Sequence, residues 1–129
     1  MFASHFVRYS LDPMDDTAMK ARTKAFALRV IKLTESLPTT RAADVIGKQL
    51  LRSATSVGAN YRASHRGKSR ADFIHKLAIV EEEADESGYW LELLVESGIV
   101  PPAKLADLMR ECDEITAIIV ASIRTAKRR

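Results

Sequence analysis

The sequence predicts an all-α fold, an antiparallel up-down-up-down four-helix bundle. Four long segments carry apolar side chains at three- and four-residue steps, which is typical of helices that face a core. Short connections join these segments, so successive helices should be antiparallel neighbours. No segment alternates with a period of two between turn signals, as a half-buried strand would. We therefore expect a single domain over residues 1–129, with helices at roughly 13–37, 40–66, 70–97 and 102–126.

The first expected helix begins at Asp12 and Pro13, a capping residue followed by one whose fixed φ suits the first helical turn. Pro38 ends it, because the residue before a proline avoids helical geometry. Its core-facing positions are Met19, Thr23, Phe26, Val30, Leu33 and Leu37.

The second expected helix begins after Thr39 or Thr40, either of which can cap it. It should end near Gly67, which we expect to adopt the left-handed conformation that often terminates helices. Its core-facing positions are Ile46, Leu50, Ala54, Val57 and Tyr61.

The third and fourth helices have equally clear boundaries. Ser69 and Asp72 form a capping box before an apolar run that ends by Gly98, and Pro101 and Pro102 precede the last helix. The core-facing positions are Phe73, Leu77, Val80, Ala84, Leu91 and Leu94 in the third helix, and Leu105, Leu108, Met109, Cys112, Ile115, Ile119 and Ile123 in the fourth.

Charge is distributed unevenly along the chain. Residues 1–70 contain 13 Lys/Arg and 5 Asp/Glu, whereas residues 71–114 contain 3 and 12, although the net charge of the whole chain is only +3. Such a division indicates electrostatic pairing, within the protein or between copies, or a binding surface.

The stretch NYRASHRGKSRADF (60–73) places five basic or potentially basic side chains within nine positions: Arg62, His65, Arg66, Lys68 and Arg70. One interpretation is that its cations contact nucleic-acid phosphates, together with Lys20, Arg22, Lys24, Arg29 and Lys32 of the first helix and the tail residues Arg128 and Arg129. The other is that they balance the negative end of the second helix and the acids of the third. The candidate nucleic-acid-binding residues are Arg62, Arg66, Lys68 and Arg70.

The acidic third helix predicts contacts of its own. A hairpin centred near residue 67 would place Arg52 opposite Glu82 and Lys48 opposite Glu86. A second, mixed face of this helix is a candidate subunit interface, or else a surface covered by the N-terminal aromatics Phe2, Phe6 and Tyr9. The interface candidates are Ile79, Glu83, Glu86, Trp90 and Leu93.

The second helix has small and polar residues in its interior. Asn60 and Gly58 are poor helix formers, so we expect close helix packing here, with Asn60 hydrogen-bonded to a neighbouring helix. The alternative is a polar contact in a binding groove. Asn60, Ser69 and Asp72 are therefore assigned structural polar roles.

Nothing in the sequence indicates catalysis, a metal or a cofactor. A di-iron bundle needs two Glu-x-x-His pairs, and the nearest spacing here is Asp72 with His75, which occurs once. Cys112 lies at core spacing and is expected to be a packed thiol. With no paired cysteine, no secretory signal at the N-terminus and no apolar run of the roughly 18 residues that cross a bilayer, we expect a cytoplasmic protein without a membrane role.

The segment SATSVGANYRASHRGKSRADFIHKLAIVEEEADESGYWLELL (53–94) resembles the central signature of the four-helix bundle protein family that includes the proteins encoded by intervening sequences in bacterial large-subunit ribosomal RNA genes. More distantly, it is similar to the accessory variability determinant of diversity-generating retroelements. The matching residues are Ser53, Ser56, Asn60, Tyr61, Arg62, Ser69, Asp72, Phe73, Glu83, Ala84, Tyr89, Trp90 and Leu91.

The resemblance implies that the protein forms homopentameric rings and has no established enzymatic reaction. The retroelement relative is associated with nucleic acid and with a reverse transcriptase partner. Two residues depart from the family pattern: Ser64 stands where an acid is usual, and Glu82 where a lysine is usual. We expect Ser64 to make the corner more basic.

The expected function is therefore a non-enzymatic homo-oligomer that presents basic patches to nucleic acid or to an acidic partner. The alternative is an assembly or adaptor module whose charge division serves subunit pairing alone.

Overall fold

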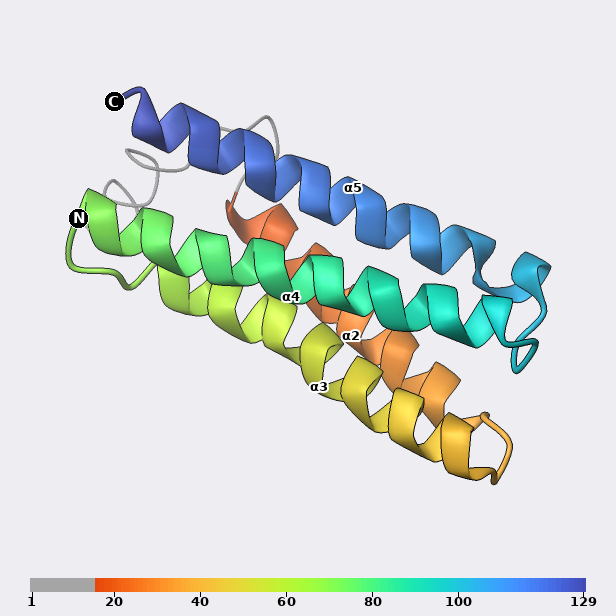
Figure 1. Ribbon diagram of the computed structural model, residues 1–129. Helices are drawn as coiled ribbons and strands as arrows, with labels where there is room; N and C mark the ends of the chain where they lie inside the picture. The colour runs from red at the N-terminus through yellow and green to blue at the C-terminus, as the bar shows by residue number, and fades with distance from the viewer. Residues whose placement is uncertain (1–15) are drawn as a thin grey trace.

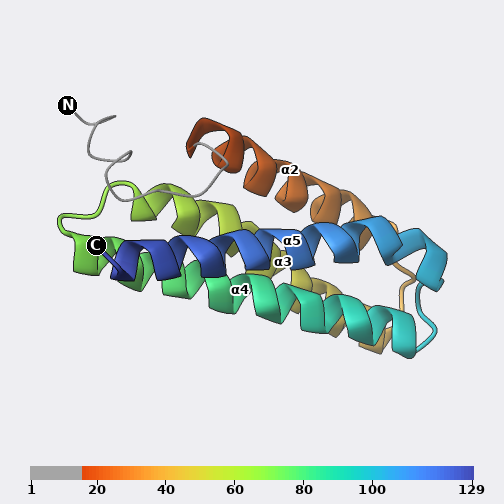
Figure 2. The same ribbon diagram turned by 90° about the horizontal axis from the view of Figure 1, so that it is seen from above.

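The computed structural model describes residues 16–129 and confirms the four-helix bundle. Successive helices pack side by side and run in opposite directions (Figure 1). Seen from above, α2 and α4 lie on opposite sides of the molecule (Figure 2). The expected cap at Asp12 and Pro13 and the aromatic residues Phe2, Phe6 and Tyr9 lie outside the described residues. The helices are α2 (Asp16–Glu35), α3 (Arg41–Ser64), α4 (Arg70–Glu96) and α5 (Pro102–Lys127).

Three of the four helix starts follow the expected chemistry. Thr40 caps α3 by accepting a hydrogen bond from the backbone N–H of Ala43, and Ser69 caps α4 by accepting from Asp72. The Asp72 carboxylate accepts a bond from the backbone N–H of Lys68, which completes the turn before α4. In α5, Pro102 occupies the first helical position, where its missing N–H has no cost.

The two helix ends that contain glycine differ from each other. Gly98 has a φ of +81° and is the left-handed residue that ends α4. Gly67 does not have a positive φ, so that prediction was wrong, and α3 already ends at Ser64 through tight i→i−3 backbone bonds. Gly67 is small for another reason, because a Cβ there would come within 2.9 Å of Asp72 Oδ2.

The core consists of the expected apolar positions of all four helices. Four of the expected core positions are only partly buried at its edge: Leu33 and Leu37 of α2, Ile46 of α3 and Met109 of α5. The fully buried large side chains are Met19, Phe26, Leu50, Tyr61, Phe73, Leu77, Leu91, Leu94, Leu105, Ile115 and Ile119, joined by His65.

Polar side chains make specific contacts between the helices. Ser87 on α4 donates to Ser53 on α3 at 3.0 Å, and both residues are fully buried. Arg22 on α2 binds Glu111 and Glu114 on α5 at 2.6–2.7 Å. These pairs set the register between helices, because each buried or half-buried polar group has to meet its partner.

Candidate nucleic-acid interface

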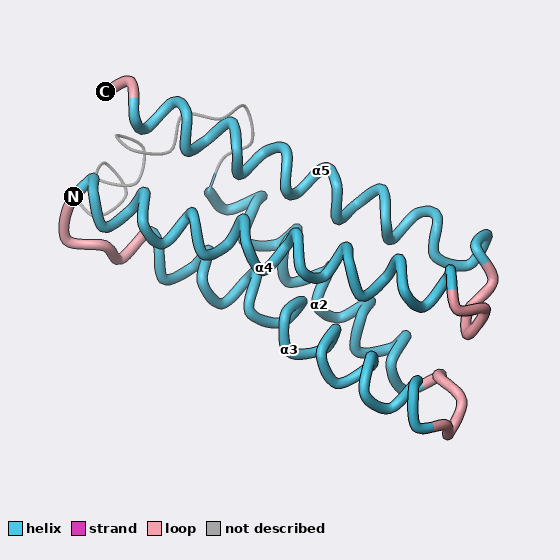
Figure 3. The backbone as a smooth tube through the Cα atoms, viewed as in Figure 1, coloured by secondary structure: helices cyan, strands magenta, loops and turns pink. Residues whose placement is uncertain are grey.

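The bundle topology gathers basic residues at one end of the molecule. Figure 3 shows the α3–α4 loop and the C-terminus at the same end, while the other two loops lie at the opposite end. This places the candidate residues of the α3–α4 corner near the basic tail of α5. We call the following set the basic end: Arg62, Arg66, Lys68, Arg70, Arg124, Lys127, Arg128 and Arg129.

The cations of the basic end have no acidic partner within residues 16–129. Arg62, Arg66 and Lys68 are exposed, Arg70 is half-buried, and none of the four makes an ion pair there. The same is true of the tail cations. Arg62 also lies in the last turn of α3, where a positive charge suits the helix dipole.

Two residues of the corner are not part of this surface. His65 is 1% exposed, and its Nε2 lies 2.7 Å from Asp16 Oδ1. Burial lowers the pKa of His65 to about 4, and the Asp16 carboxylate only partly opposes this, so the imidazole is neutral at pH 7. Ser64 is also buried and donates to the Tyr61 carbonyl, so it brings no acid to the corner but is not itself part of the exposed surface.

Two acids of α4, Glu83 and Glu86, pair with a cation that does not belong to the corner. Arg52 on α3 lies 3.3 Å from Glu83 and also binds Glu86, and the carboxylate of Glu83 raises the pKa of Arg52. The predicted pairs of Arg52 with Glu82 and of Lys48 with Glu86 are therefore not made, and Arg52 itself binds Glu86. Lys48 instead pairs with Asp44, four residues earlier in its own helix.

The interface candidates lie on the side of α4 that faces α3. All five, Ile79, Glu83, Glu86, Trp90 and Leu93, are partly buried within the monomer. The Trp90 indole packs against the core and its N–H donates to Glu86 Oε1 at 3.4 Å. This row is therefore partly covered by α3, and the side chain it leaves exposed is the neighbouring Tyr89, at 53%.

Asn60 does not reach a neighbouring helix. Its amide donates to the carbonyl of Ser56, one turn earlier in α3, so the prediction of an inter-helix bond was wrong. Asn side chains often hydrogen-bond to backbone groups of their own segment in this way. Ser69 caps α4 as predicted, but the capping box is not complete, because the Asp72 carboxylate accepts from the backbone N–H of Lys68 rather than from that of Ser69.

A groove runs between α2 and α3 and adjoins the basic end at Arg62. It has a volume of about 630 Å³, and most of its floor is Ala, Gly and Thr. Gly58 lets α2 and α3 approach closely there, since a Cβ would lie 3.2 Å from Thr23 Oγ1 on α2, a tight contact that would push the two helices apart. Lys20, Lys24 and Arg62 stand at its rim, whereas Arg22, which we expected to contact phosphate, is bound to Glu111 and Glu114.

The remaining candidates for chemistry are the metal-ligating and nucleophilic side chains of the described helices. Within residues 16–129, no three His, Cys, Asp or Glu side chains gather as metal ligands do, and His75 is exposed. Cys112 is a packed thiol, as predicted: it donates to the Ala84 carbonyl at 3.1 Å, and burial raises its pKa to about 12. No helix in this part of the chain is both long and apolar enough to cross a membrane.

The family of the chain follows from a comparison with family models. Residues 15–121 match the model of the 23S rRNA-intervening sequence protein. The chain belongs to this family. The family match covers all of α2, α3 and α4 and most of α5, so it includes both the corner and the α2–α3 groove.

A solved structure shows the same architecture. It is a crystal structure of a protein of unknown function from the S23 ribosomal protein family of Bacteroides thetaiotaomicron. The two chains share 37% identity with a TM-score of 0.80, over 86% of this chain and 99% of the other. No curated protein was found to match the chain.

Proposed function

We propose that this protein is a non-enzymatic homo-oligomer that binds the phosphate backbone of nucleic acid through its basic end. The observation that carries the proposal is that the cations of the basic end have no acidic partner within residues 16–129, while Arg52 neutralises Glu83 and Glu86. Cations that are clustered without acidic partners repel one another, and a bound polyanion such as nucleic acid relieves that repulsion.

The chemistry of the basic end favours contacts with phosphates rather than bases. Its exposed side chains are Arg and Lys, and the nearest aromatic residues of the corner, Tyr61 and Phe73, are buried in the core. Because the described corner presents no exposed ring to stack on bases, binding should be directed at the backbone and largely independent of sequence.

Assembly would multiply this weak contact. The resemblance noted above implies five copies in a ring, and a ring repeats the basic end once per copy, so that several weak phosphate contacts add by avidity. Light scattering at micromolar concentration should give a mass well above the 14.3 kDa of one chain. A monomer would remove the assembly part of the proposal.

The binding part is tested by the salt dependence of affinity. Wild-type protein, titrated against mixed-sequence RNA and DNA in gel shifts, should lose affinity steeply as salt increases. In the Arg66→Gln/Arg70→Gln variant the slope of log K against log salt should become shallower by about two units, with an unchanged melting temperature.

A matched control uses cations from the opposite end of the bundle. Arg41 begins α3 and Lys104 lies in the first turn of α5, and both are exposed. Arg41→Gln/Lys104→Gln should leave the salt slope unchanged. If wild type binds neither nucleic acid at physiological salt, and Arg66→Gln/Arg70→Gln instead alters oligomer size or stability, the adaptor alternative replaces the proposal.

A further inference from the structure

The α2–α3 groove has the shape and chemistry of a site for a large side chain of another protein. Its floor includes Ala21, Ala25 and Ala59, all exposed and none of them able to fill the space. Leu28 lies on the same surface and is 59% exposed, so it adds apolar area to the exposed alanines of the groove. An apolar floor with Lys24 at its rim suits an aromatic ring, since a cation can lie against the ring face.

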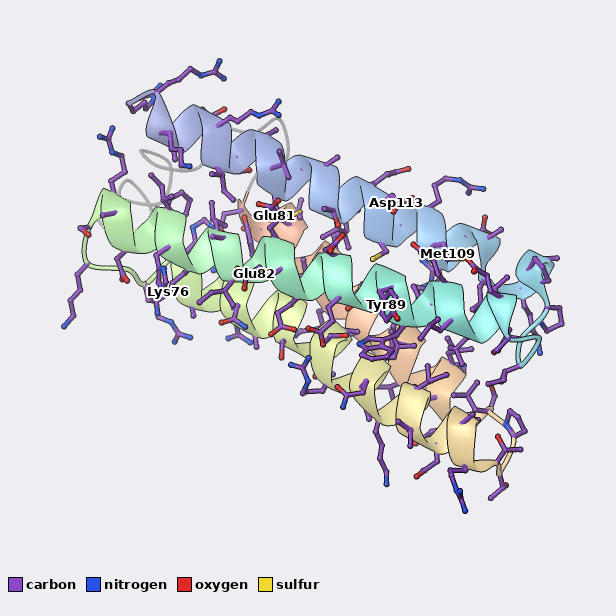
Figure 4. All side chains as sticks on the ribbon, in the orientation of Figure 1. Lys76, Glu81, Glu82, Tyr89, Met109 and Asp113 are labelled. Atoms are coloured by element: carbon purple, nitrogen blue, oxygen red, sulfur yellow. The ribbon has the colours of Figure 1, made fainter. Side chains whose placement is uncertain are left out.

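Tyr89 is a matching projection on the same chain. It is 53% exposed, and Figure 4 shows it on the side of α4 toward the viewer, together with Glu82. Its ring meets that of Trp90 edge-on, with centroids 5.1 Å apart, and Trp90 in turn donates to Glu86, which binds Arg52. The exposed ring is therefore supported by a chain of contacts that extends to α3, so little conformational entropy remains to be lost on binding.

The two surfaces also carry charges of opposite sign. Asp85 and Glu92 stand four residues before and three residues after Tyr89, so they share its side of α4. Both are exposed, and neither makes an ion pair within residues 16–129. The groove presents Lys24 and Arg62, which are likewise without an acidic partner there.

We propose that Tyr89 of one copy inserts into the α2–α3 groove of a second copy, with Asp85 and Glu92 meeting Lys24 at its rim, while Arg62 stays with the basic end. The contact is head-to-tail, because the projection and the groove are different surfaces of one chain. Trp90 and Glu86, which support Tyr89, lie on the side of the bundle formed by α3 and α4, and the groove lies on the side formed by α2 and α3. The two sides share α3, so they are adjacent rather than opposite. When each copy binds the next through adjacent sides, successive copies are rotated relative to one another, which allows a ring to close.

This inference rests on the proposed assembly and names its contact surface. Two variants test it, each disabling one surface: Tyr89→Ala removes the projection, and Ala59→Glu fills the groove and repels the acids of α4. Each should weaken self-association by about tenfold or more and reduce the mass seen by light scattering, with helical circular dichroism and melting temperature retained. Val45→Ala, at another exposed apolar residue, and Ala117→Glu, at an exposed alanine of α5, are the matched controls and should assemble as wild type does.

The decisive step is to mix the two defective variants. Tyr89→Ala keeps an intact groove and Ala59→Glu an intact Tyr89, so the mixture should form a dimer and nothing larger. Failure to form that dimer, or retention of full-size assemblies by either single variant, would overturn the inference. If wild type itself were monomeric, the proposed assembly would fail first, whereas a wild-type oligomer that is unaffected by both variants would contradict only this contact.

Discussion

At the scale of single residues, His65 shows how burial changes the meaning of a basic side chain. The sequence places it among arginines and a lysine, yet it lies in the core between Tyr61 and Phe73, at ring-centroid distances of 4.7 and 5.5 Å. Its Nε2 faces Asp16 at 2.7 Å, and Lys20 adds a positive charge nearby that disfavours protonation. The neutral imidazole is therefore part of the fold rather than of the charged surface.

This environment makes the stability of the protein depend on pH. The pKa of His65 is about 4 in the folded state and about 6.5 in the unfolded chain, so between these values the unfolded state binds more protons. The free energy of unfolding should therefore fall as the pH drops from about 6.5 to about 4, by no more than about 3 kcal/mol from this group. Urea denaturation at several pH values would measure it. His65→Gln should show a weaker dependence over this range, and an equally steep decline in that variant would assign the effect to other groups.

At the scale of the elements, the turns are decided by local backbone geometry more than by composition. Gly67 and Gly98 both follow a long helix, but only Gly98 has the left-handed φ, and no atom lies within 4 Å of where its Cβ would be. Gly88 is different again, since it lies inside α4 and a Cβ there would make an ordinary 3.7 Å contact with Cys112 Sγ. A glycine is thus needed for its backbone conformation at position 98 and for space at position 67, whereas position 88 has room for a side chain.

Alanine substitution at two of these glycines should have opposite effects on stability. Gly98→Ala places a side chain in the left-handed region and should lower the free energy of unfolding by about 1 kcal/mol. Gly88→Ala should raise it by up to about 1 kcal/mol, because the helix gains propensity and the added methyl group fits. Thermal or chemical denaturation of both variants checks the pair. Destabilisation by Gly88→Ala would show that α4 and α5 approach more closely than this structure has them.

At the scale of the whole molecule, the number and direction of the helices decide where the charges meet. Because four antiparallel helices return the chain to the end where the α3–α4 corner lies, Arg128 and Arg129 join Arg66 and Arg70 although some 60 residues separate them. The opposite end carries the α2–α3 and α4–α5 connections and a mixture of charges. The basic end is thus a product of topology acting on two basic segments.

Removing the tail cations should therefore weaken nucleic-acid binding in the same way as removing the cations of the corner. Arg128→Gln/Arg129→Gln should make the salt slope for nucleic acid shallower, and the fourfold variant with Arg66→Gln/Arg70→Gln by about four units in total. Gel shifts at several salt concentrations provide the measurement. A tail variant with the slope of wild type would restrict the contact surface to the corner.

The sequence by itself determined the fold class, the core and most helix ends, because apolar spacing, proline and capping residues act over a few neighbouring positions. It also located the cations of the corner, Arg62, Arg66, Lys68 and Arg70, which have no acidic partner within residues 16–129. Tertiary structure alone decided which charges are already paired: Arg52 meets Glu83 and Glu86 rather than Glu82, since the helix crossing sets the register to within one turn. It also decided that His65 and Ser64 are buried, that Tyr89 and not Trp90 projects from α4, and that a groove lies between α2 and α3. These features depend on how far one helix is rotated against the next, and periodicity along a single chain does not contain that angle.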